Sequence, residues 1–169
     1  KLYDSSKMNN RYVYDDFGEL EKIEQYQLTE DEIVEYVSRF DYEIDSLHRM
    51  GFVDYILLVY SYANVAKRRG IARGSGGGSL VCYVSNITDI DPIEHKLYFE
   101  RFVDVGALDL LESGEITQKE LKIPDIDLDF SSDSCAEVLD FLVSKYGENN
   151  VASIGRFGTN KTKGTIRDM

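Results

Sequence analysis

The sequence centres on Pro124-Asp125-Ile126-Asp127-Leu128-Asp129-Phe130, a stretch in which acidic and apolar residues alternate. Successive side chains of a strand point to opposite faces, which places the three aspartates on one face and the apolar residues on the other. Carboxylates two positions apart on a strand are separated by roughly 6–7 Å. Two divalent cations about 3.5–4 Å apart, as used for two-metal phosphoryl transfer, would fit between them. The alternative is an edge strand made acidic to prevent aggregation.

A second motif, Arg73-Gly74-Ser75-Gly76-Gly77-Gly78-Ser79, lies between two apolar segments. Unobstructed backbone amides can form a nest for phosphate oxygens, and a following helix N-terminus strengthens such a site. Arg73 would add a charge-assisted contact. Valine at Gly76 or Gly77 should then block close backbone approach and any positive φ that the turn requires. A flexible linker has a similar composition and remains the alternative.

Helix signals surround both motifs. Thr29 and Glu32 have the spacing of a capping box, and apolar residues at helical intervals predict a helix from there to Gly51. Further helices are predicted over 52–66, from about 79, from 91 through 102 and over 132–146, with strands over 123–130 and 151–154. Residues 1–28 show no clear period and form a poorly defined segment. Mixed helices and few strands indicate an α/β or α+β fold.

Composition and charge narrow the class of protein. The chain of 169 residues is 43% hydrophobic, enough for a buried core. Since no apolar run reaches roughly 18 residues, we expect no membrane span. The net charge of -12 disfavours a nucleic-acid partner. The basic residues nevertheless gather near glycines in two places, at Lys67-Arg68-Arg69 with Arg73 and at Arg156-Lys161-Lys163-Arg167. Cys82 and Cys135 are expected to be free thiols.

Taken together, the motifs resemble the C-family DNA polymerases, the bacterial DNA polymerase III alpha subunits. The resemblance extends from about residue 36 to the end of the chain and rests on blocks that occur in the same order. They are Tyr42-Glu43-Ile44-Asp45, Met50-Gly51-Phe52 with Tyr55, residues 73–81, Ile87-Thr88-Asp89-Ile90-Asp91-Pro92, Phe99-Glu100-Arg101-Phe102, residues 124–130, and Phe157-Gly158-Thr159 with Lys163, Ile166, Arg167 and Asp168.

This resemblance implies that residues 29–169 form the first part of a polymerase palm with the polymerase-β-like nucleotidyltransferase fold and a helical N-terminal portion. The family's catalytic, metal-binding pair falls on Asp125 and Asp127, not on Asp129, with two Mg²⁺ ions as cofactors. The nucleotide-binding residues that it implies are Arg73, Gly74, Ser75, Arg101 and Lys163.

The implied activity is that of a DNA-directed DNA polymerase, which transfers a nucleotide from a dNTP to a primer 3′ end on primer-template DNA. The resemblance also implies a cytoplasmic setting, in a bacterial cell or a phage-infected bacterium, and a stretch between Arg101 and Pro124 that is longer than usual suggests a divergent or viral member. The family's third catalytic carboxylate lies downstream of Met169. We therefore expect that remaining polymerase segments or a partner chain are needed. The alternatives are a non-enzymatic structural or split-polymerase subunit and a nucleotidyltransferase with a non-DNA acceptor.

Overall fold

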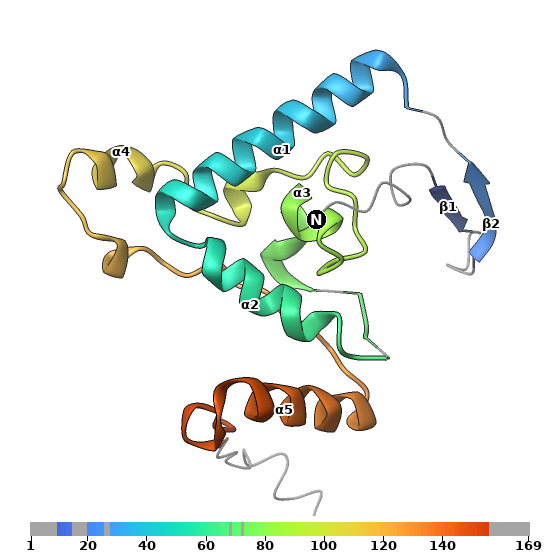
Figure 1. The fold of residues 1–169 in the computed structure, drawn as a ribbon. Coiled ribbons are helices and arrows are strands. Elements are labelled where there is room, and N and C mark those ends of the chain that lie inside the picture. Colours follow the sequence, from blue (N-terminus) through green and yellow to red (C-terminus); the bar gives the residue numbers. More distant parts are fainter. Residues whose placement is uncertain (1–9, 15–19, 26–27, 68, 72, 156–169) are drawn as a thin grey trace, which may run out of the picture.

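A computed structural model describes residues 10–14, 20–25, 28–67, 69–71 and 73–155 (Figure 1). The elements in chain order are β1 (Asn10–Tyr14), β2 (Leu20–Gln25), α1 (Glu30–Met50), α2 (Val53–Ala63), η2 (Gly74–Gly78), α3 (Leu80–Val84), η3 (Phe99–Arg101), α4 (Ala107–Glu112), η4 (Gln118–Glu120), α5 (Ser132–Tyr146) and η5 (Glu148–Asn150). Here η marks a 3-10 helix. The described part of the chain is thus mostly helical.

The predicted α/β palm is not confirmed by this architecture. The one sheet of the described residues is an antiparallel hairpin of β1 and β2, in a region for which the sequence predicts no element. Residues 123–130 are extended, as predicted, but they take part in isolated bridges and not in a named strand. The strand predicted over 151–154 is wrong, because this stretch is irregular and Ile154 is 92% exposed, without a partner face to cover it.

The helix predicted from Thr29 to Gly51 is confirmed as α1. The Thr29 side chain accepts a hydrogen bond from the Glu32 amide, and the Glu32 carboxylate accepts one from the Thr29 amide, which completes the capping box. Gly51 ends the helix with φ 78°, in the left-handed region that favours glycine. Similarly, α5 begins after Ser131, whose side chain accepts from the Ser134 amide, and ends at Gly147 as predicted.

Two predicted helices differ from the structure. α2 ends at Ala63 and buries one face through Ile56 and Val59, whereas a helix buried on all sides was expected up to residue 66. Residues 91–102 form turns and the short η3, not one helix. Asp91 does accept from the Ile93 and Glu94 amides like an N-cap, but Lys96 has a φ of 53°, which interrupts any helix.

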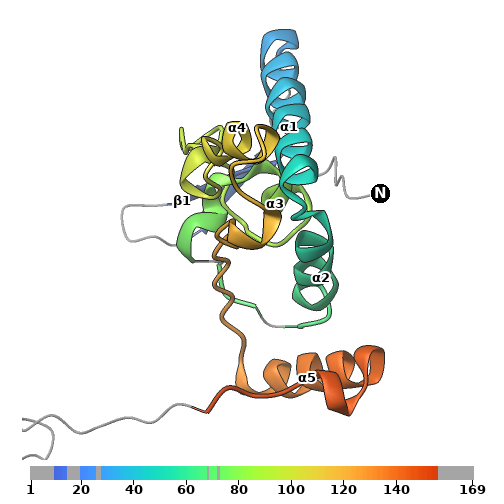
Figure 2. The same ribbon diagram turned by 90° about the vertical axis from the view of Figure 1, so that its left-hand side faces the viewer.

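The core lies between α1, α2, α3 and η3. α1 and α2 run along one side of α3, and α5 lies beyond α2 at the end of the extended stretch that follows η4 (Figures 1 and 2). The buried cluster is made of Leu47, Met50, Phe52, Ile56, Val59, Ala63, Val81, Cys82, Ile87, Phe99, Phe102, Val103 and Leu108. Cys82 is buried and Cys135 is exposed, and both are free thiols as predicted.

Candidate active site

The glycine turn, residues 73–79, and the acidic segment, residues 124–130, lie side by side. The Arg73 amide donates to the Asp127 carbonyl at 2.9 Å, and the Asp127 amide donates back to the Arg73 carbonyl at 3.4 Å. The Ser75 hydroxyl donates to the Asp125 carbonyl at 3.0 Å. Because Gly76, Gly77 and Gly78 are buried within this packing, the glycine turn is an ordered part of the fold. The linker alternative is wrong.

Close backbone approach within the glycine turn occurs at its two ends. Gly74 has a φ of 81°, and a Cβ built there would lie 3.3 Å from Asp127 Oδ2. A Cβ at Gly78 would lie only 2.6 Å from the Tyr98 carbonyl oxygen. At Gly76 and Gly77, by contrast, the nearest atom would be an ordinary 3.5 Å away. Inside the fold, the positions with least room for a side chain are therefore Gly74 and Gly78, and in this turn only Gly74 has a positive φ. The effect of valine at Gly76 or Gly77 on nucleotide binding stays a prediction.

The acidic segment shows the alternation that its sequence predicts. Ile126 and Leu128 pack against the hydrophobic core, while Asp125, Asp127 and Asp129 are exposed. The Tyr55 hydroxyl donates to the Pro124 carbonyl at 2.9 Å and so ties the start of the segment to α2. Burial raises the pKa of Tyr55 to about 12, with smaller contributions from neighbours that include Asp125 and Asp127. The Tyr55 hydroxyl therefore remains a donor at neutral pH.

The three aspartates differ in their partners. Asp129 receives two hydrogen bonds from the Arg73 guanidinium, at 2.6 and 2.8 Å. The Asp125 and Asp127 carboxylates form no hydrogen bond or ion pair with another described residue. Within the described ranges, no group of three or more histidine, cysteine or acidic side chains has an arrangement that could hold a metal ion. The acidic segment therefore offers a pair of open carboxylates and a third that is already neutralised.

The chemistry of this pair fits Mg²⁺, which prefers hard oxygen ligands and commonly binds through one or two carboxylates plus substrate phosphates. Asp125 and Asp127 are exposed and lie next to a glycine whose missing side chain leaves room beside Asp127. Without a cation, two neighbouring carboxylates on one face repel each other. The donor set is thus suitable but partial.

The remaining predicted site residues have different surroundings. Arg101 is exposed on η3, and η3 packs against the glycine turn, so its backbone is near the candidate site. In the described part of the chain its side chain has no ion pair. Lys163 lies outside the described residues, as do Arg156 and the other basic residues of that stretch.

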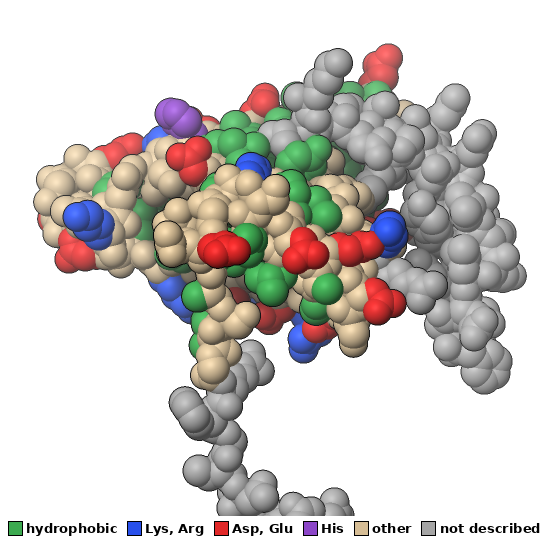
Figure 3. All heavy atoms as spheres, turned by 60° about the horizontal axis from the view of Figure 1, so that its bottom comes forward, with side chains coloured by type: hydrophobic (Ala, Val, Ile, Leu, Met, Phe, Trp, Pro, Cys, Tyr) green, Lys and Arg blue, Asp and Glu red, His purple; other side chains and the backbone are tan. Residues whose placement is uncertain are grey.

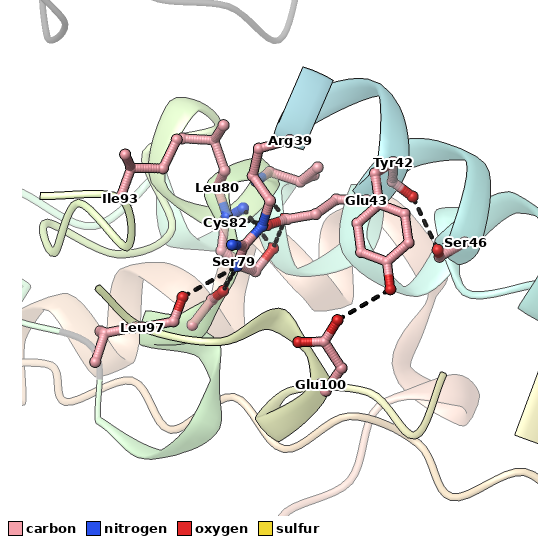
Figure 4. A network of polar contacts seen from close by, with 12 residues as sticks. Arg39, Tyr42, Glu43, Ser46, Ser79, Leu80, Cys82, Ile93, Leu97 and Glu100 are labelled. Carbon is pink, nitrogen blue, oxygen red and sulfur yellow. Dashed lines mark hydrogen bonds and ion pairs between the residues drawn. The ribbon is translucent and has the colours of Figure 1, made fainter. Parts of the chain in front are cut away.

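A buried carboxylate that the sequence reasoning did not single out lies behind the glycine turn. Glu43 of α1 is fully buried and accepts hydrogen bonds from the Ser79 hydroxyl, the Leu80 and Val81 amides and Arg39 (Figure 4). Burial raises the pKa of Glu43, and these four donors act in the opposite direction. The spacing of Arg39 and Glu43, four residues apart on a helix, is the signal from which this pair could have been found.

Comparison with known proteins identifies the family. A family model described as the bacterial DNA polymerase III alpha NTPase domain matches residues 7–169. This chain belongs to the bacterial DNA polymerase III alpha family. The DNA polymerase III subunit alpha of Aquifex aeolicus is 40% identical over 139 residues, which are 80% of this chain and 11% of that protein. The Bacillus subtilis subunit is 41% identical over 79% of this chain and 11% of its own length.

A third alpha subunit, from Buchnera aphidicola, is 35% identical over 167 residues, or 96% of this chain and 12% of that protein. The resemblance to the C-family polymerases is thereby confirmed. The matched part of the chain spans only 11–12% of the length of these polymerase III alpha relatives.

The surface charge of this polymerase III alpha domain is mixed. Figure 3 shows the face at the bottom of Figure 1, where acidic and basic side chains are interspersed with hydrophobic ones. In the basic stretch before the glycine turn, Lys67 pairs with Glu137 at 2.7 Å and Arg69 with Asp89 at 3.2 Å. These cations therefore have internal partners. Among the described helices, none is long and apolar enough to cross a membrane.

Proposed function

We propose that this chain provides the nucleotidyl-transfer residues of a DNA-directed DNA polymerase, which adds a deoxynucleotide from a dNTP to a primer 3′ end in the bacterial cytoplasm. The observation that carries this proposal is the packing of the segment that bears the two open carboxylates, Asp125 and Asp127, against the glycine turn. The Ser75 hydroxyl donates to the Asp125 carbonyl, and a Cβ on Gly74 would lie 3.3 Å from Asp127 Oδ2. In a polymerase, one feature would hold the catalytic cations and the other the triphosphate, and the reaction needs both at one place.

Each residue then has a defined task. Asp125 and Asp127 would hold two Mg²⁺ ions, which would supply Lewis-acid activation of the primer hydroxyl and positive charge at the departing pyrophosphate. Gly74 and Ser75 form the wall against which the triphosphate lies, since Gly74 has no side chain to obstruct it. Arg73, Arg101 and Lys163 contribute positive charge to the phosphates, and Asp129 orients the Arg73 guanidinium through its two hydrogen bonds.

The decisive experiment compares three aspartate variants in a complete polymerase that contains this segment. Asp125→Asn and Asp127→Asn should each lower kcat for primer extension by at least about three orders of magnitude, because each removes a ligand charge at the reacting phosphate. Asp129→Asn, on the same segment, is the matched control and should cost far less. Equal losses for all three variants would contradict the assignment of the pair.

The chain alone should not extend a primer. A carboxylate pair supplies only part of the near-octahedral coordination that Mg²⁺ demands. A net charge of -12 also disfavours binding to DNA, so the remaining polymerase segments or a partner chain are needed to bind primer-template DNA. Incubation of the purified chain with primer-template, dNTPs and Mg²⁺ tests this. Robust extension that Asp127→Asn abolishes would contradict it.

A further inference from the structure

The C-terminal half of the glycine turn is fixed by two residues of α1, Arg39 and Glu43. One Glu43 oxygen, Oε2, accepts from the Ser79 hydroxyl at 2.8 Å and from the Val81 amide at 3.1 Å. The other, Oε1, accepts from the Leu80 amide at 3.0 Å and from Arg39 Nε at 2.6 Å. Both oxygens thus have two donors each, in a site that excludes water.

Arg39 extends this network to a second loop. Its Nη2 donates to the Gly78 carbonyl at 2.9 Å and to the Leu97 carbonyl at 3.2 Å. The Arg39 guanidinium therefore joins Gly78 of the glycine turn to Leu97, which directly precedes Tyr98 and η3 (Figure 4). The same two loops are in close contact at Gly78 and Tyr98, where a Cβ on Gly78 would lie 2.6 Å from the Tyr98 carbonyl oxygen.

These two loops carry four of the candidate nucleotide-binding residues. The glycine turn bears Arg73, Gly74 and Ser75, and η3 bears Arg101. Their relative position determines whether the backbone wall and the Arg101 charge can reach one triphosphate. A hydrogen-bonded Arg–Glu pair, with a planar donor group that reaches two carbonyls at once, restricts that position more tightly than apolar packing would.

We propose that Arg39 and Glu43 are positioning residues for nucleotide binding, which set the glycine turn and the Arg101 loop at the separation that the triphosphate requires. This inference rests on the proposed function. Neither residue touches the substrate, and both act through the loops that do. Because the pair fixes the binding site and not the carboxylates, its loss should affect the KM for dNTP more than kcat.

The principal variant is Arg39→Lys, which keeps the charge. The ammonium of lysine lacks the planar fork and cannot reproduce the contacts to Glu43 and both carbonyls. Glu43→Gln is the second variant, since an amide has one acceptor oxygen and must present a donor to either the Leu80 or the Val81 amide. The matched control is Arg49→Lys. Arg49 lies on the same helix and also pairs with an acid four residues away, Asp45, but its partners Asp45 and Glu112 belong to α1 and α4, and none of its bonds reaches the glycine turn.

The experiment measures kcat and KM for dNTP in primer extension by the complete polymerase. We expect Arg39→Lys and Glu43→Gln to raise KM by about tenfold or more and to change kcat by less than about threefold, as for a site displaced by a fraction of an ångström. Arg49→Lys should leave both constants unchanged. Thermal unfolding of each variant establishes that the protein is folded.

Two results would overturn the inference, and they are distinguishable. If Asp127→Asn abolishes extension while Arg39→Lys and Glu43→Gln retain the wild-type KM, the pair is purely structural and only this inference fails. If Asp125→Asn and Asp127→Asn both retain activity, the proposed function fails and the positioning role fails with it.

Discussion

Acidic side chains lie on both sides of the glycine turn, in opposite environments. On one side, Glu43 is fully buried and all its donors come from the protein. On the other, Asp125 and Asp127 are exposed, and their carboxylates form no hydrogen bond or ion pair with another described residue. The first arrangement serves the fold, since a buried charge is tolerated only when it is fully hydrogen-bonded. The second leaves the carboxylate oxygens available to a ligand.

The comparison shows how one turn can be rigid and still present an open face. Its C-terminal half is held by Glu43 and Arg39, and its N-terminal half contacts the acidic segment through the backbone of Arg73 and the Ser75 hydroxyl. Backbone contacts leave the side chains of Asp125 and Asp127 unused. Substitutions on the two sides should therefore change different properties.

The largest effect on stability is expected from Glu43→Ala. Loss of the carboxylate removes the acceptor of the Ser79 hydroxyl and of two buried backbone amides and leaves the Arg39 charge without its acidic partner, which should lower the free energy of unfolding by about 3–5 kcal/mol. Asp127→Asn, on the exposed side, should change it by less than about 0.5 kcal/mol. Urea denaturation of both variants measures the difference. Comparable losses would mean that the two acidic sites do not differ in the way described.

The next effect concerns two adjacent glycines of the glycine turn, Gly77 and Gly78. Gly78→Ala places a methyl group against the Tyr98 carbonyl and should destabilise the protein by about 1–3 kcal/mol, the usual cost of overpacking. Gly77→Ala is the matched control, because its nearest neighbour, the Ile90 Cδ1, lies 3.5 Å from the new Cβ. Thermal unfolding should show a lower Tm for Gly78→Ala alone. A similar Tm for both variants would show that the loops separate easily.

Local patterns in the sequence predicted local structure well. The capping box at Thr29, the glycine stop at Gly51 and the alternation over 124–130 were all confirmed, since each depends on near neighbours in the chain. The predicted helix over 91–102 was wrong although its N-cap bonds form, because the positive φ of Lys96 interrupts the helix. Asp91 is buried and accepts from the Tyr36 hydroxyl at 2.6 Å, a contact that no local pattern contains.

The candidate site was predictable only in part for the same reason. The two motifs were recognisable in the sequence, but the contact between them joins residues 50 or more positions apart in the chain and is shown by the structure. Which glycines are required was not predictable, because the answer depends on Tyr98 and Asp127, which are distant in sequence. The burial of Glu43 was hidden as well, since its charge suggested a solvated position on α1.

A smaller effect is expected where α2 holds the acidic segment. Tyr55→Phe removes the hydrogen bond to the Pro124 carbonyl and should lower the free energy of unfolding by about 0.5–1.5 kcal/mol. Tyr60→Phe is the control, because Tyr60 lies on the same helix and its hydroxyl bonds to no described residue. Urea denaturation distinguishes the two. If Tyr55→Phe also lowers kcat of the complete polymerase, the bond helps to place Asp125 as well as to stabilise the fold.

The smallest effect on stability is expected for the ion pair of Arg73 and Asp129. Asp129 has a protein partner, like Glu43, but it is exposed, like Asp125 and Asp127. The side chains of the two residues are 67% and 56% exposed, so water and salt screen their attraction and ordering two long side chains offsets part of the gain. A double-mutant cycle of Arg73→Ala and Asp129→Ala, measured as the free energy of unfolding of each variant in low salt, should give a coupling energy near the limit of measurement. In high salt the coupling should vanish. A strong coupling that persists in high salt would contradict this expectation. It would mean that Asp129, like Glu43, stabilises the fold, and that only Asp125 and Asp127 of this segment are available to a ligand.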